Sequence, residues 1–447
     1  MASEASPSSF SKVDGLPFLG SIVPLSRDAR AYFTRLLQEH GDRIRMKVLG
    51  RDVLLLAHPQ DIEQVLVRDQ ASYGRSAEVR KLAPIFGDGL LSSEGDLWGR
   101  QRKMIQPNFR HEALAKYASI MLSVIQRQML AWKDGATIDI HHEMMAYTRD
   151  VICRVLFGED VAEEHSKLGE AVSTVFGGLR SEVLYLPVWR RLPFRRSREW
   201  SRAVAILNEA VRSAIDRGRG FKEQRSDLLA ALIEARDDEG KGMSDEQIHD
   251  EILTFFLAGH ETAALGLTWT LHALAANPQT QETMREEMQQ LLPEHGELTP
   301  AAYSKLRWTT AVAKESMRLY PPVWSMGRKA VRDTTIDGHI VKKGTDIWLC
   351  SYQLHRDARW FAEPDRFLPE RWLREPAPKP FTYIPFGIGQ RVCIGQHFAM
   401  MEIVLGLAAM VKNFRLKAVS EKEPEMSAWI TLRPERPIHV RLEAIAL

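Results

Sequence analysis

The sequence of 447 residues predicts a mainly α-helical fold with a small β subdomain. One long helical pattern covers residues 244–277. Segments with a strand pattern are short and lie outside the central helical part of the chain. We expect a single domain over residues 1–447, of which residues 1–14 form a short tail. Shorter helical patterns recur around 121–132, 142–157 and 203–217.

Composition and charge are those of an ordinary globular protein. Hydrophobic residues make up 45% of the chain and charged residues 26%, which argues against a disordered or fibrous protein. Sixty basic residues nearly balance 58 acidic ones, so the net charge of +2 gives no reason to expect nucleic acid as a partner. The N-terminal residues show neither a signal peptide nor an apolar run of the roughly 20 residues that span a membrane. We therefore expect a soluble, cytoplasmic monomer without a transmembrane segment.

The first strand-like segment, 43–57, predicts two short strands that turn at Gly50-Arg51. A His-Pro pair follows, and a helix is expected to begin at Asp61. Glycines then punctuate the segment 73–95, which is either a lid or a buried connection. Its apolar members include Leu82, Ile85 and Phe86.

Three cysteines stand far apart in the sequence, at positions 153, 350 and 393. They are too few for a disulfide framework, and their spacing does not match a Cys-x-x-Cys zinc site. A reducing compartment is therefore expected. Cys393 differs from the other two because it lies in a loop with three glycines, where a thiolate can serve as a metal ligand. The alternative for Cys393 is a buried structural cysteine.

The loop around Cys393 reads Phe-x-x-Gly-x-Arg-x-Cys-x-Gly over residues 386–395. This pattern resembles the haem-binding loop of the haem-thiolate monooxygenases, the cytochrome P450 family. The resemblance implies the P450 fold and one haem b, with Cys393 as the axial ligand of the iron. It also assigns Phe386 and Arg391 to cofactor binding. In that family the thiolate pushes electron density through the iron and favours O–O cleavage.

The long helix over 244–277 carries the second motif, Ala258-Gly259-His260-Glu261-Thr262. A glycine inside a helix costs about 1 kcal/mol relative to alanine, so it calls for a packing or functional reason. In the family this motif opens a groove beside the iron, which assigns Gly259 to cofactor binding. The threonine hydroxyl holds the bound oxygen there and the neighbouring acid relays protons, roles that fall to Thr262 and Glu261. The alternative is a tolerated glycine and a threonine bonded to its own helical turn.

Further cofactor contacts are expected from Trp98, Arg102 and Arg328. The four-residue spacing of Trp98 and Arg102 places both side chains on one face of a helix. In the family an indole N–H and a guanidinium at this position donate to the haem propionates. An ordinary amphipathic helix with a surface arginine is the alternative. Arg328 follows an extended double-proline segment and is expected to make another propionate contact.

Glu315 and Arg318 stand three residues apart on a predicted helix, and Arg371 lies in a Pro-Glu-Arg segment. Such a helical pair is usually a solvated ion pair. The family, however, locks its core with a Glu-x-x-Arg pair and an arginine from a Pro-Glu-Arg segment. We assign the three residues to folding rather than chemistry.

The remaining segments suggest elements rather than chemistry. Residues 184–198 combine two prolines, five arginines and bulky apolar side chains, and correspond in the family to the connection that roofs the substrate pocket. This segment is either a solvated loop or a contact with an anionic lipid surface. Strands are expected at 334–340, turning at Asp337-Gly338, and at 345–352, a helix at 396–414, and a closing hairpin of strands at 429–432 and 438–442.

The resemblance implies that one atom of O2 enters an apolar small molecule, by hydroxylation or epoxidation, with electrons from NAD(P)H. Fatty acids, terpenoids, steroids, carotenoids and polyketides all remain open as substrates, and Arg51 is a candidate partner for a substrate carboxylate. A same-fold peroxygenase or isomerase, or a haem sensor, is the alternative, although the Glu261-Thr262 pair favours a monooxygenase. By position in the family pattern, the substrate-facing residues are Leu82, Ile85, Phe86, Phe255, Ala258, Val323 and Trp429.

The electron donor is expected to be a separate protein. The residues after Cys393 contain neither a glycine-rich phosphate loop nor a cysteine cluster for a flavin or iron–sulfur group. The expected partner is a ferredoxin or flavodoxin with its reductase. Because these carriers are generally acidic, Arg100, Lys103 and Arg110 are expected to form an exposed basic docking patch.

Overall fold

The computed structural model of the chain describes residues 10–76, 79, 83–158, 171, 174–175, 195–220, 227–292, 296 and 298–445. The expected pocket residue Leu82 and most of the segment 184–198 lie outside the described residues. The chain divides into two units. The sheet unit comprises the described residues of 1–80, 314–393 and 424–435, and the helical unit comprises those of 81–313, 394–423 and 436–447.

A six-stranded sheet in the order β1-β2-β3-β9-β6-β4 organises the sheet unit. Burial along β2 alternates, so its apolar residues face the core and its basic residues face outward. In β3 four successive residues are buried, which is typical of a strand covered on both faces. The strands are β1 (Ser11–Val13), β2 (Arg43–Val48), β3 (Arg51–Leu56), β4 (Tyr73–Arg75), β6 (Met326–Ala330) and β9 (Asp346–Leu349).

The turn between β2 and β3 consists of Leu49 and Gly50. Their φ angles of 49° and 75° are those of a two-residue hairpin turn whose twist suits the flanking strands. Arg51 already pairs with Val48. The sequence therefore predicted the two strands correctly and placed the turn one residue too late.

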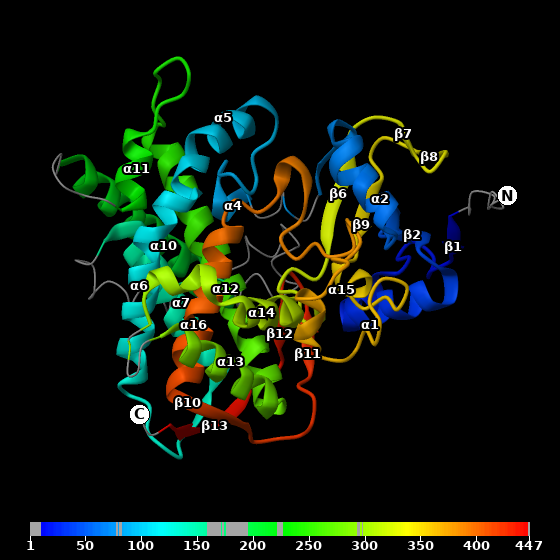
Figure 1. Cartoon of the computed structure of the whole chain (residues 1–447). Helices are drawn as coiled ribbons and strands as arrows, with labels where there is room; N and C mark the ends of the chain where they lie inside the picture. The colour runs from blue at the N-terminus through cyan, green and yellow to red at the C-terminus, as the bar shows by residue number, and fades with distance from the viewer. Residues whose placement is uncertain are drawn as a thin grey trace. The chain divides into compact units, whose positions relative to one another are not determined.

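Helices cover the sheet. The helix α1 (Ile22–His40) packs beside β2, and α2 (Pro59–Glu63) continues into the π-helical turn η1 (Gln64–Arg68) (Figure 1). The predicted start at Asp61 is two residues late because Pro59 occupies the first turn, where a missing N–H costs nothing. Side chains from α2 and η1 join those of β3 and β9 in one apolar core.

The smaller elements of the sheet unit include two hairpins. The first turns at Asp337-Gly338 as predicted. In the second, Trp429 to Thr431 form the turn and not a strand, so the predicted hairpin of 429–432 with 438–442 is wrong. Pro437 interrupts the strand pattern between these segments, and the later strand pairs elsewhere. The elements are β7 (Thr334–Ile336), β8 (His339–Val341), α15 (Ser351–Leu354), β11 (Met426–Ala428) and β12 (Leu432–Pro434).

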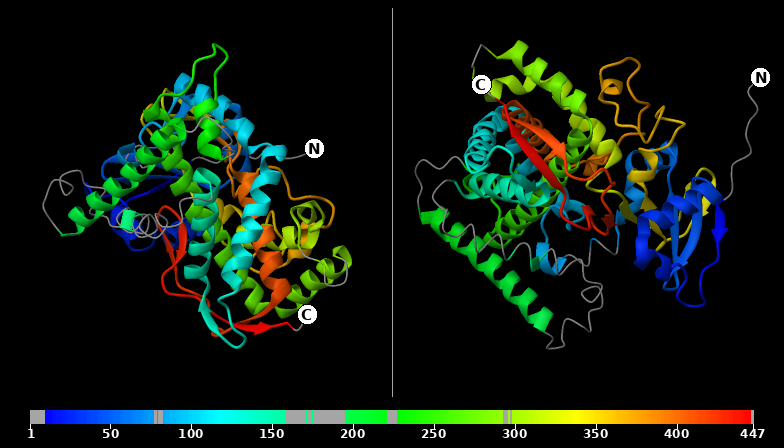
Figure 2. Two further views of the ribbon diagram at one scale, coloured as in Figure 1. Left: turned by 90° about the vertical axis from the view of Figure 1, so that its left-hand side faces the viewer. Right: turned by 90° about the horizontal axis from the view of Figure 1, so that it is seen from below.

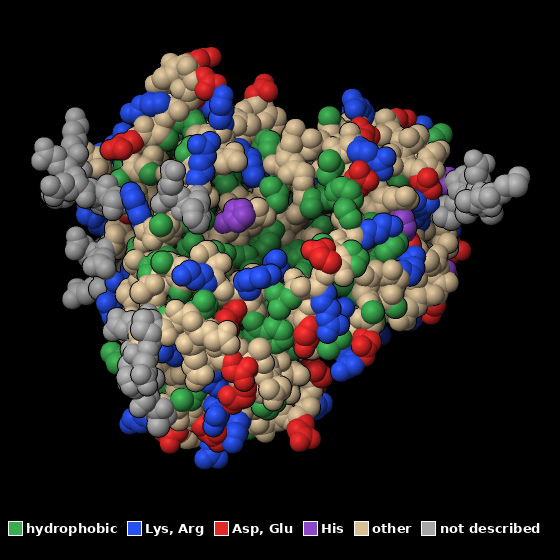
Figure 3. All heavy atoms as spheres, in the orientation of Figure 1, with side chains coloured by type: hydrophobic (Ala, Val, Ile, Leu, Met, Phe, Trp, Pro, Cys, Tyr) green, Lys and Arg blue, Asp and Glu red, His purple; other side chains and the backbone are tan. Residues whose placement is uncertain are grey.

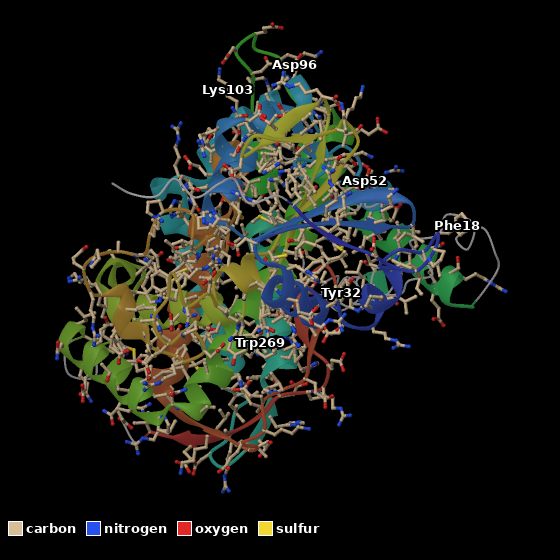
Figure 4. All side chains as sticks on the ribbon, turned by 90° about the vertical axis from the view of Figure 1, so that its right-hand side faces the viewer. Phe18, Tyr32, Asp52, Asp96, Lys103 and Trp269 are labelled. Carbon is tan, nitrogen blue, oxygen red and sulfur yellow. The ribbon has the colours of Figure 1, made fainter. Side chains whose placement is uncertain are left out.

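The helical unit is built around α12 (Asp245–Ala276), the long helix that the sequence predicted. Ser244 and Gln247 form a reciprocal capping box at its start, and Asn277 caps its end. Its neighbours are α7 (Ile140–Phe157) and α16 (Gln396–Asn413), and Trp269 in its centre is fully buried (Figures 1 and 4). A helix with this many apolar residues on all sides belongs in a core.

Other helices surround α12, and a small sheet in the order β10-β13-β5 lies at one end of the unit (Figure 2). The helix α14 (Arg307–Leu319) spans the boundary between the units. The remaining elements are α4 (Ala83–Phe86), α5 (Gly95–Ile105), η3 (Gln106–Phe109), α6 (His111–Met129), β5 (Thr137–Asp139), α10 (Arg195–Gly220), α11 (Leu228–Glu234), α13 (Pro278–Leu291), η6 (Pro300–Lys305), β10 (Phe414–Ala418) and β13 (His439–Ala444).

Basic and acidic side chains are interspersed over the face drawn in Figure 3. Among the described residues, no helix combines the length and the apolar character needed to cross a membrane.

Candidate active site

The loop around Cys393 has a backbone that only glycine can provide. Gly387 and Gly389 have φ angles of 70° and 75°, and a Cβ on Gly389 would lie 2.0 Å from the carbonyl oxygen of Leu66. The amide of Cys393 donates to the carbonyl of Phe386 at 2.9 Å and closes the loop. Cys393 is exposed, whereas Cys153 and Cys350 are buried. The one accessible cysteine is therefore the one in the ligand motif.

Two arginines of the sheet unit accompany this loop. Arg328 lies on β6, and its guanidinium donates to the carbonyl of Gly327 at 2.9 Å. Burial, together with the positive charge of Arg391, lowers the pKa of Arg328 to about 10. Two guanidinium groups that repel each other, one of them two residues before Cys393 in the chain, suit an anionic group, which a haem propionate would provide. The donor set of the loop thus fits a haem: a thiolate for the iron and two cations for carboxylates.

The second motif lies on the helical unit and forms a gap in the burial of α12. From Glu251 to Ala275 every residue is buried except Ala258, Gly259 and Thr262. The spacing of three and four residues places these three on one helical face. A Cβ on Gly259 would approach the nearest side-chain atom, of Ile152, only to 3.6 Å. Packing against the described residues therefore does not require this glycine, which favours a functional reason.

Thr262 and Glu261 occupy different surroundings. The hydroxyl of Thr262 donates to the carbonyl of Ala258 at 2.7 Å, so its oxygen still has lone pairs to accept a hydrogen bond. Glu261 is 1% exposed and lies in the interior of the unit. The structure thus brings Thr262, Ala258 and Gly259 to one open face, with the acid beside them in the chain.

His260, in the middle of the motif, is held by α7. Its Nε2 lies 3.1 Å from the carbonyl of Met145, and its own carbonyl accepts a hydrogen bond of 2.9 Å from the hydroxyl of Thr148. One residue of α12 is thereby bound to a single turn of α7 at two points. These contacts fix the rotation of α12 at the motif and keep the face with Thr262 turned away from α7.

Trp98 and Arg102 lie on α5 on one face, as their spacing predicted. The guanidinium carbon of Arg102 is 5.8 Å from the centroid of the Trp98 ring, a cation–π distance. Both side chains are half-buried. An indole N–H and a guanidinium held side by side are suitable donors to a carboxylate.

The predicted exposed basic patch is wrong for Arg100, and Lys103 is exposed as predicted but paired with an acid. Arg100 binds Asp237 at 2.6 Å and the carbonyls of Lys241 and Gly242, and it is only partly exposed. Lys103 forms an ion pair with Asp238, beside the turn drawn in green in Figure 4. The acidic turn between α11 and α12 therefore neutralises two of the three cations. The sequence did not reveal these ion pairs, because the two acids lie far from the two cations along the chain.

The expected substrate-facing residues fall into three environments. Ile85 and Phe86 are each 4% exposed in α4. Phe255 is buried on α12, with its ring centroid 5.5 Å from that of Phe109. Val323 is half-buried, and Trp429 is exposed at the turn of the hairpin β11–β12. Of these expected residues, Phe255 and Ala258 are three residues apart on α12 and therefore lie on one face of that helix.

Glu315 stands at the centre of a buried ion cluster in the sheet unit. Its carboxylate accepts from Arg318 at 2.8 and 2.9 Å and from Arg371 at 3.0 Å. The indole of Trp372 and the amide of Leu368 each donate to it at 2.9 Å. The structure thus brings together the three residues that the sequence grouped, with Glu315 and Arg318 fully buried.

The sequence did not single out another buried carboxyl, Glu251. It lies on α12 at four and seven residues before Phe255 and Ala258, and therefore on the same helical face. Burial raises the pKa of Glu251 to about 8. This helical spacing from the motif was the signal that could have identified it.

Comparison with known proteins decides the family. The model of the cytochrome P450 family matches residues 11–442. The chain belongs to the cytochrome P450 family. It is thus a haem-thiolate monooxygenase, which uses O2 and reducing equivalents, and the expectation of this enzyme class and cofactor is confirmed.

Several similar proteins come from bacteria of the genus Streptomyces. Cyclooctatin synthase of Streptomyces melanosporofaciens is 35% identical over 437 residues, which cover 95% of this chain and 94% of that protein. Pentalenene oxygenase of Streptomyces avermitilis is 30% identical over 419 residues, 92% of each protein. Cyclooctat-9-en-7-ol 5-monooxygenase of Streptomyces melanosporofaciens is 31% identical over 411 residues, 90% of this chain and 88% of that one.

A solved structure confirms the fold class. Retinoic acid-bound cyanobacterial CYP120A1 has a TM-score of 0.89 with this chain at 24% identity, and the match covers 99% of this chain and 100% of that one. The mainly α-helical fold with a small β subdomain is therefore that of the P450 family, as the sequence predicted. A P450 of bacterial type acts on a small molecule and receives its electrons from redox partners.

Proposed function

We propose that this P450 inserts one oxygen atom from O2 into an apolar terpenoid, by hydroxylation or epoxidation. The observation that carries the proposal is the gap in the burial of α12, where Ala258, Gly259 and Thr262 present two small apolar residues and one hydroxyl. Two similar proteins support the substrate class, since their names specify oxidation of pentalenene and of cyclooctat-9-en-7-ol. A face of this composition binds a substrate by shape and burial rather than by charge.

Within this proposal, Cys393 would hold the haem iron, and Phe386 and Gly259 would contribute to haem binding. The haem, when bound, supplies the activation of O2 that a thiolate ligand promotes. Trp98, Arg102, Arg328 and Arg391 would donate to its propionates through charge-assisted hydrogen bonds. Occupancy by a carboxylate offsets the repulsion between Arg328 and Arg391.

Thr262 and Glu261 control protons on the distal side. The Thr262 hydroxyl gives its hydrogen to the Ala258 carbonyl, so its Oγ1 can accept a hydrogen bond. Glu261, the preceding residue in the chain, is the carboxyl that would supply the proton. The buried contacts of His260 with Met145 and Thr148 keep this pair in place.

A neutral substrate is favoured over a fatty acid. Arg51, the expected partner for a substrate carboxylate, donates to Asp346 at 2.8 Å, and Asp346 is 1% exposed. Arg51 is therefore already paired with a nearly buried anion, which makes it a weaker partner for a free substrate carboxylate. Terpenoid hydrocarbons and alcohols carry no carboxylate and therefore do not need Arg51 as a partner.

The electrons come from NAD(P)H through a ferredoxin or flavodoxin and its reductase. Arg110 is exposed at the end of η3 and remains a candidate for docking, whereas Arg100 and Lys103 are paired with acids. A contact that depends on few cations responds weakly to ionic strength. We therefore expect the rate at which the carrier reduces this chain to vary little with ionic strength once Arg110 is neutralised.

The proposal is tested with the purified chain, a ferredoxin, its reductase, NADPH and 18O2. Cyclic terpene hydrocarbons are expected to shift the Soret band on binding and to gain one labelled oxygen. Palmitic acid is the comparison substrate. A Soret shift and labelled product with palmitic acid alone would contradict the terpenoid assignment.

The relay is tested by Thr262→Ala in the same assay. The variant is expected to bind haem and substrate normally while it diverts most of the consumed NADPH to hydrogen peroxide, because proton delivery fails and electron delivery does not. Thr262→Ser should retain most of the coupling. Equal product per NADPH in the alanine variant and the parent chain would remove the relay role.

A further inference from the structure

The turn Gly87–Ser93 in the helical unit is bound to α12 by two consecutive acids. The amide of Asp88 donates to the carboxylate of Asp250 at 2.8 Å. The amide of Leu90 donates to Glu251 at 3.0 Å. Glu251 is fully buried, so this second contact lies out of water.

The same turn is bound from the other side by Gln101 of α5. Its amide nitrogen donates to the carbonyl of Asp88 at 2.7 Å, and its amide oxygen accepts from the hydroxyl of Ser93 at 2.7 Å. Gln101 is fully buried and Ser93 is 3% exposed. The side chain that holds the turn is thus adjacent in the chain to Arg102, the proposed propionate donor.

Close approach explains the two glycines of the turn. Gly87 has a φ of 50°, and a Cβ there would lie 2.0 Å from the carboxylate of Asp250. A Cβ on Gly89 would lie 2.2 Å from the hydroxyl of Thr254 and 2.7 Å from the carbonyl of Asp250. Any side chain at either position would push the turn away from α12.

Glu251 links the turn to the proposed substrate face. Helical spacing places Glu251, Phe255, Ala258 and Thr262 on one side of α12. The turn covers the first of these positions, and the gap in burial exposes the third and fourth. Residues that precede the turn directly, in α4, include the buried Ile85 and Phe86.

We propose that Asp250, Glu251 and Gln101 are specificity-determining positioning residues, which hold the turn Gly87–Ser93 and thereby set the positions of Ile85 and Phe86 against the substrate. The inference rests on the proposed function, because it takes Ile85 and Phe86 as substrate-facing. The three polar residues do not touch the substrate. They act through the backbone of the turn.

The protonation of Glu251 supports this arrangement. Burial, and to a lesser degree the charge of Asp250, raises the pKa of Glu251 to about 8, so the carboxyl is neutral at pH 7. Other charged groups nearby are His249, 3.1 Å from Asp250, Asp88 of the turn, and Arg100 of α5, which binds Asp237 and approaches Gln247 at 3.5 Å. Ionisation above pH 8 would put two carboxylates side by side under the turn and loosen it.

The experiment uses the haem-loaded chain and three variants. Glu251→Ala removes the acceptor for the Leu90 amide, whereas Glu251→Gln retains an acceptor and removes the ionisation. Glu246→Gln is the matched control, since Glu246 is exposed on the same helix. Readouts are hydrogen exchange at the amides of Asp88 and Leu90, the ratio of regioisomeric products from a cyclic terpene, and the affinity for that terpene between pH 7 and 9.

Glu251→Ala is expected to speed exchange at Leu90 by about tenfold or more and to change the product ratio, with the carbon monoxide spectrum intact. Glu251→Gln should keep the slow exchange and remove the loss of affinity above pH 8 that we expect for the parent. The control should match the parent in all three readouts.

Unchanged exchange at Leu90 in Glu251→Ala would overturn the holding contact. Faster exchange with an unchanged product ratio would overturn the role in specificity. If Glu251→Ala does not fold, an equal pH dependence of affinity in the parent and in Glu251→Gln overturns the inference. Absence of labelled product from the parent chain contradicts the proposed function instead, and exchange at Leu90 then decides the holding contact by itself.

Discussion

Glu315 and Glu251 are two glutamates buried to the same extent in surroundings of opposite character. Glu315, in the sheet unit, receives hydrogen bonds from two guanidinium groups, an indole and a backbone amide. Glu251, in the helical unit, receives one bond from the amide of Leu90 and has Asp250 beside it. The first is the centre of a buried ion cluster, and the second is a neutral carboxyl that accepts a hydrogen bond from a turn. Partners, not burial, decide which role a buried acid takes.

Glu315→Gln should have the largest effect, because it leaves the fully buried Arg318 and the half-buried Arg371 without their counter-charge. Breaking a buried pair in this way costs about 3–5 kcal/mol. Urea unfolding of the haem-loaded protein measures the loss, and Glu363→Gln, which removes an exposed ion pair with Arg366, is the control. A loss of stability equal to that of the control would show that Glu315 does not hold this cluster together.

Glu251→Gln, in contrast, should make the protein more stable than the parent at alkaline pH. The pKa of Glu251 is raised from its ordinary value to about 8 in the folded protein, so the folded state retains a proton that the unfolded state has released. The contribution of this group to stability therefore falls as pH rises from about 4.5 to 8, by at most about 1.4 kcal/mol per pH unit, and is constant above pH 8. The glutamine variant lacks this fall. Parallel stability curves for variant and parent between pH 5 and 8 would refute the neutral carboxyl.

Thr148→Val should lower stability by less than the Glu315 variant does. It tests a buried contact between α7 and α12 in which no acid takes part. The variant removes the hydrogen bond to the His260 carbonyl, worth about 1 kcal/mol, and loosens the orientation of the proton relay. Product formed per NADPH is expected to fall, with Thr148→Ser restoring it. A change in stability without a change in coupling would limit Thr148 to packing.

The sequence predicted correctly those features that depend on residues close together in the chain. The capping box of Ser244 predicted the start of α12 correctly, and the glycines around Cys393 marked a loop whose φ angles only glycine adopts readily. A four-residue spacing was sufficient to place Trp98 and Arg102 together.

What the sequence missed depends on tertiary partners. Arg100 and Lys103 looked like free surface cations because Asp237 and Asp238 lie far along the chain. The hairpin turn at Trp429 was mistaken for a strand, since Trp429 and Ile430 are residue types typical of strands and here lie exposed in a turn. Glu251 was overlooked because its state depends on a turn that only the fold brings against it.

The central claim is that Cys393 is the ligand of the haem iron, and the carbon monoxide spectrum of reduced Cys393→Ala tests it most directly. The parent chain should give the red-shifted Soret band that a thiolate ligand produces, as should Cys153→Ala and Cys350→Ala, whose thiols are buried. Cys393→Ala should lose that band. Persistence of the band in Cys393→Ala, with its loss in either of the other two variants, would contradict the account.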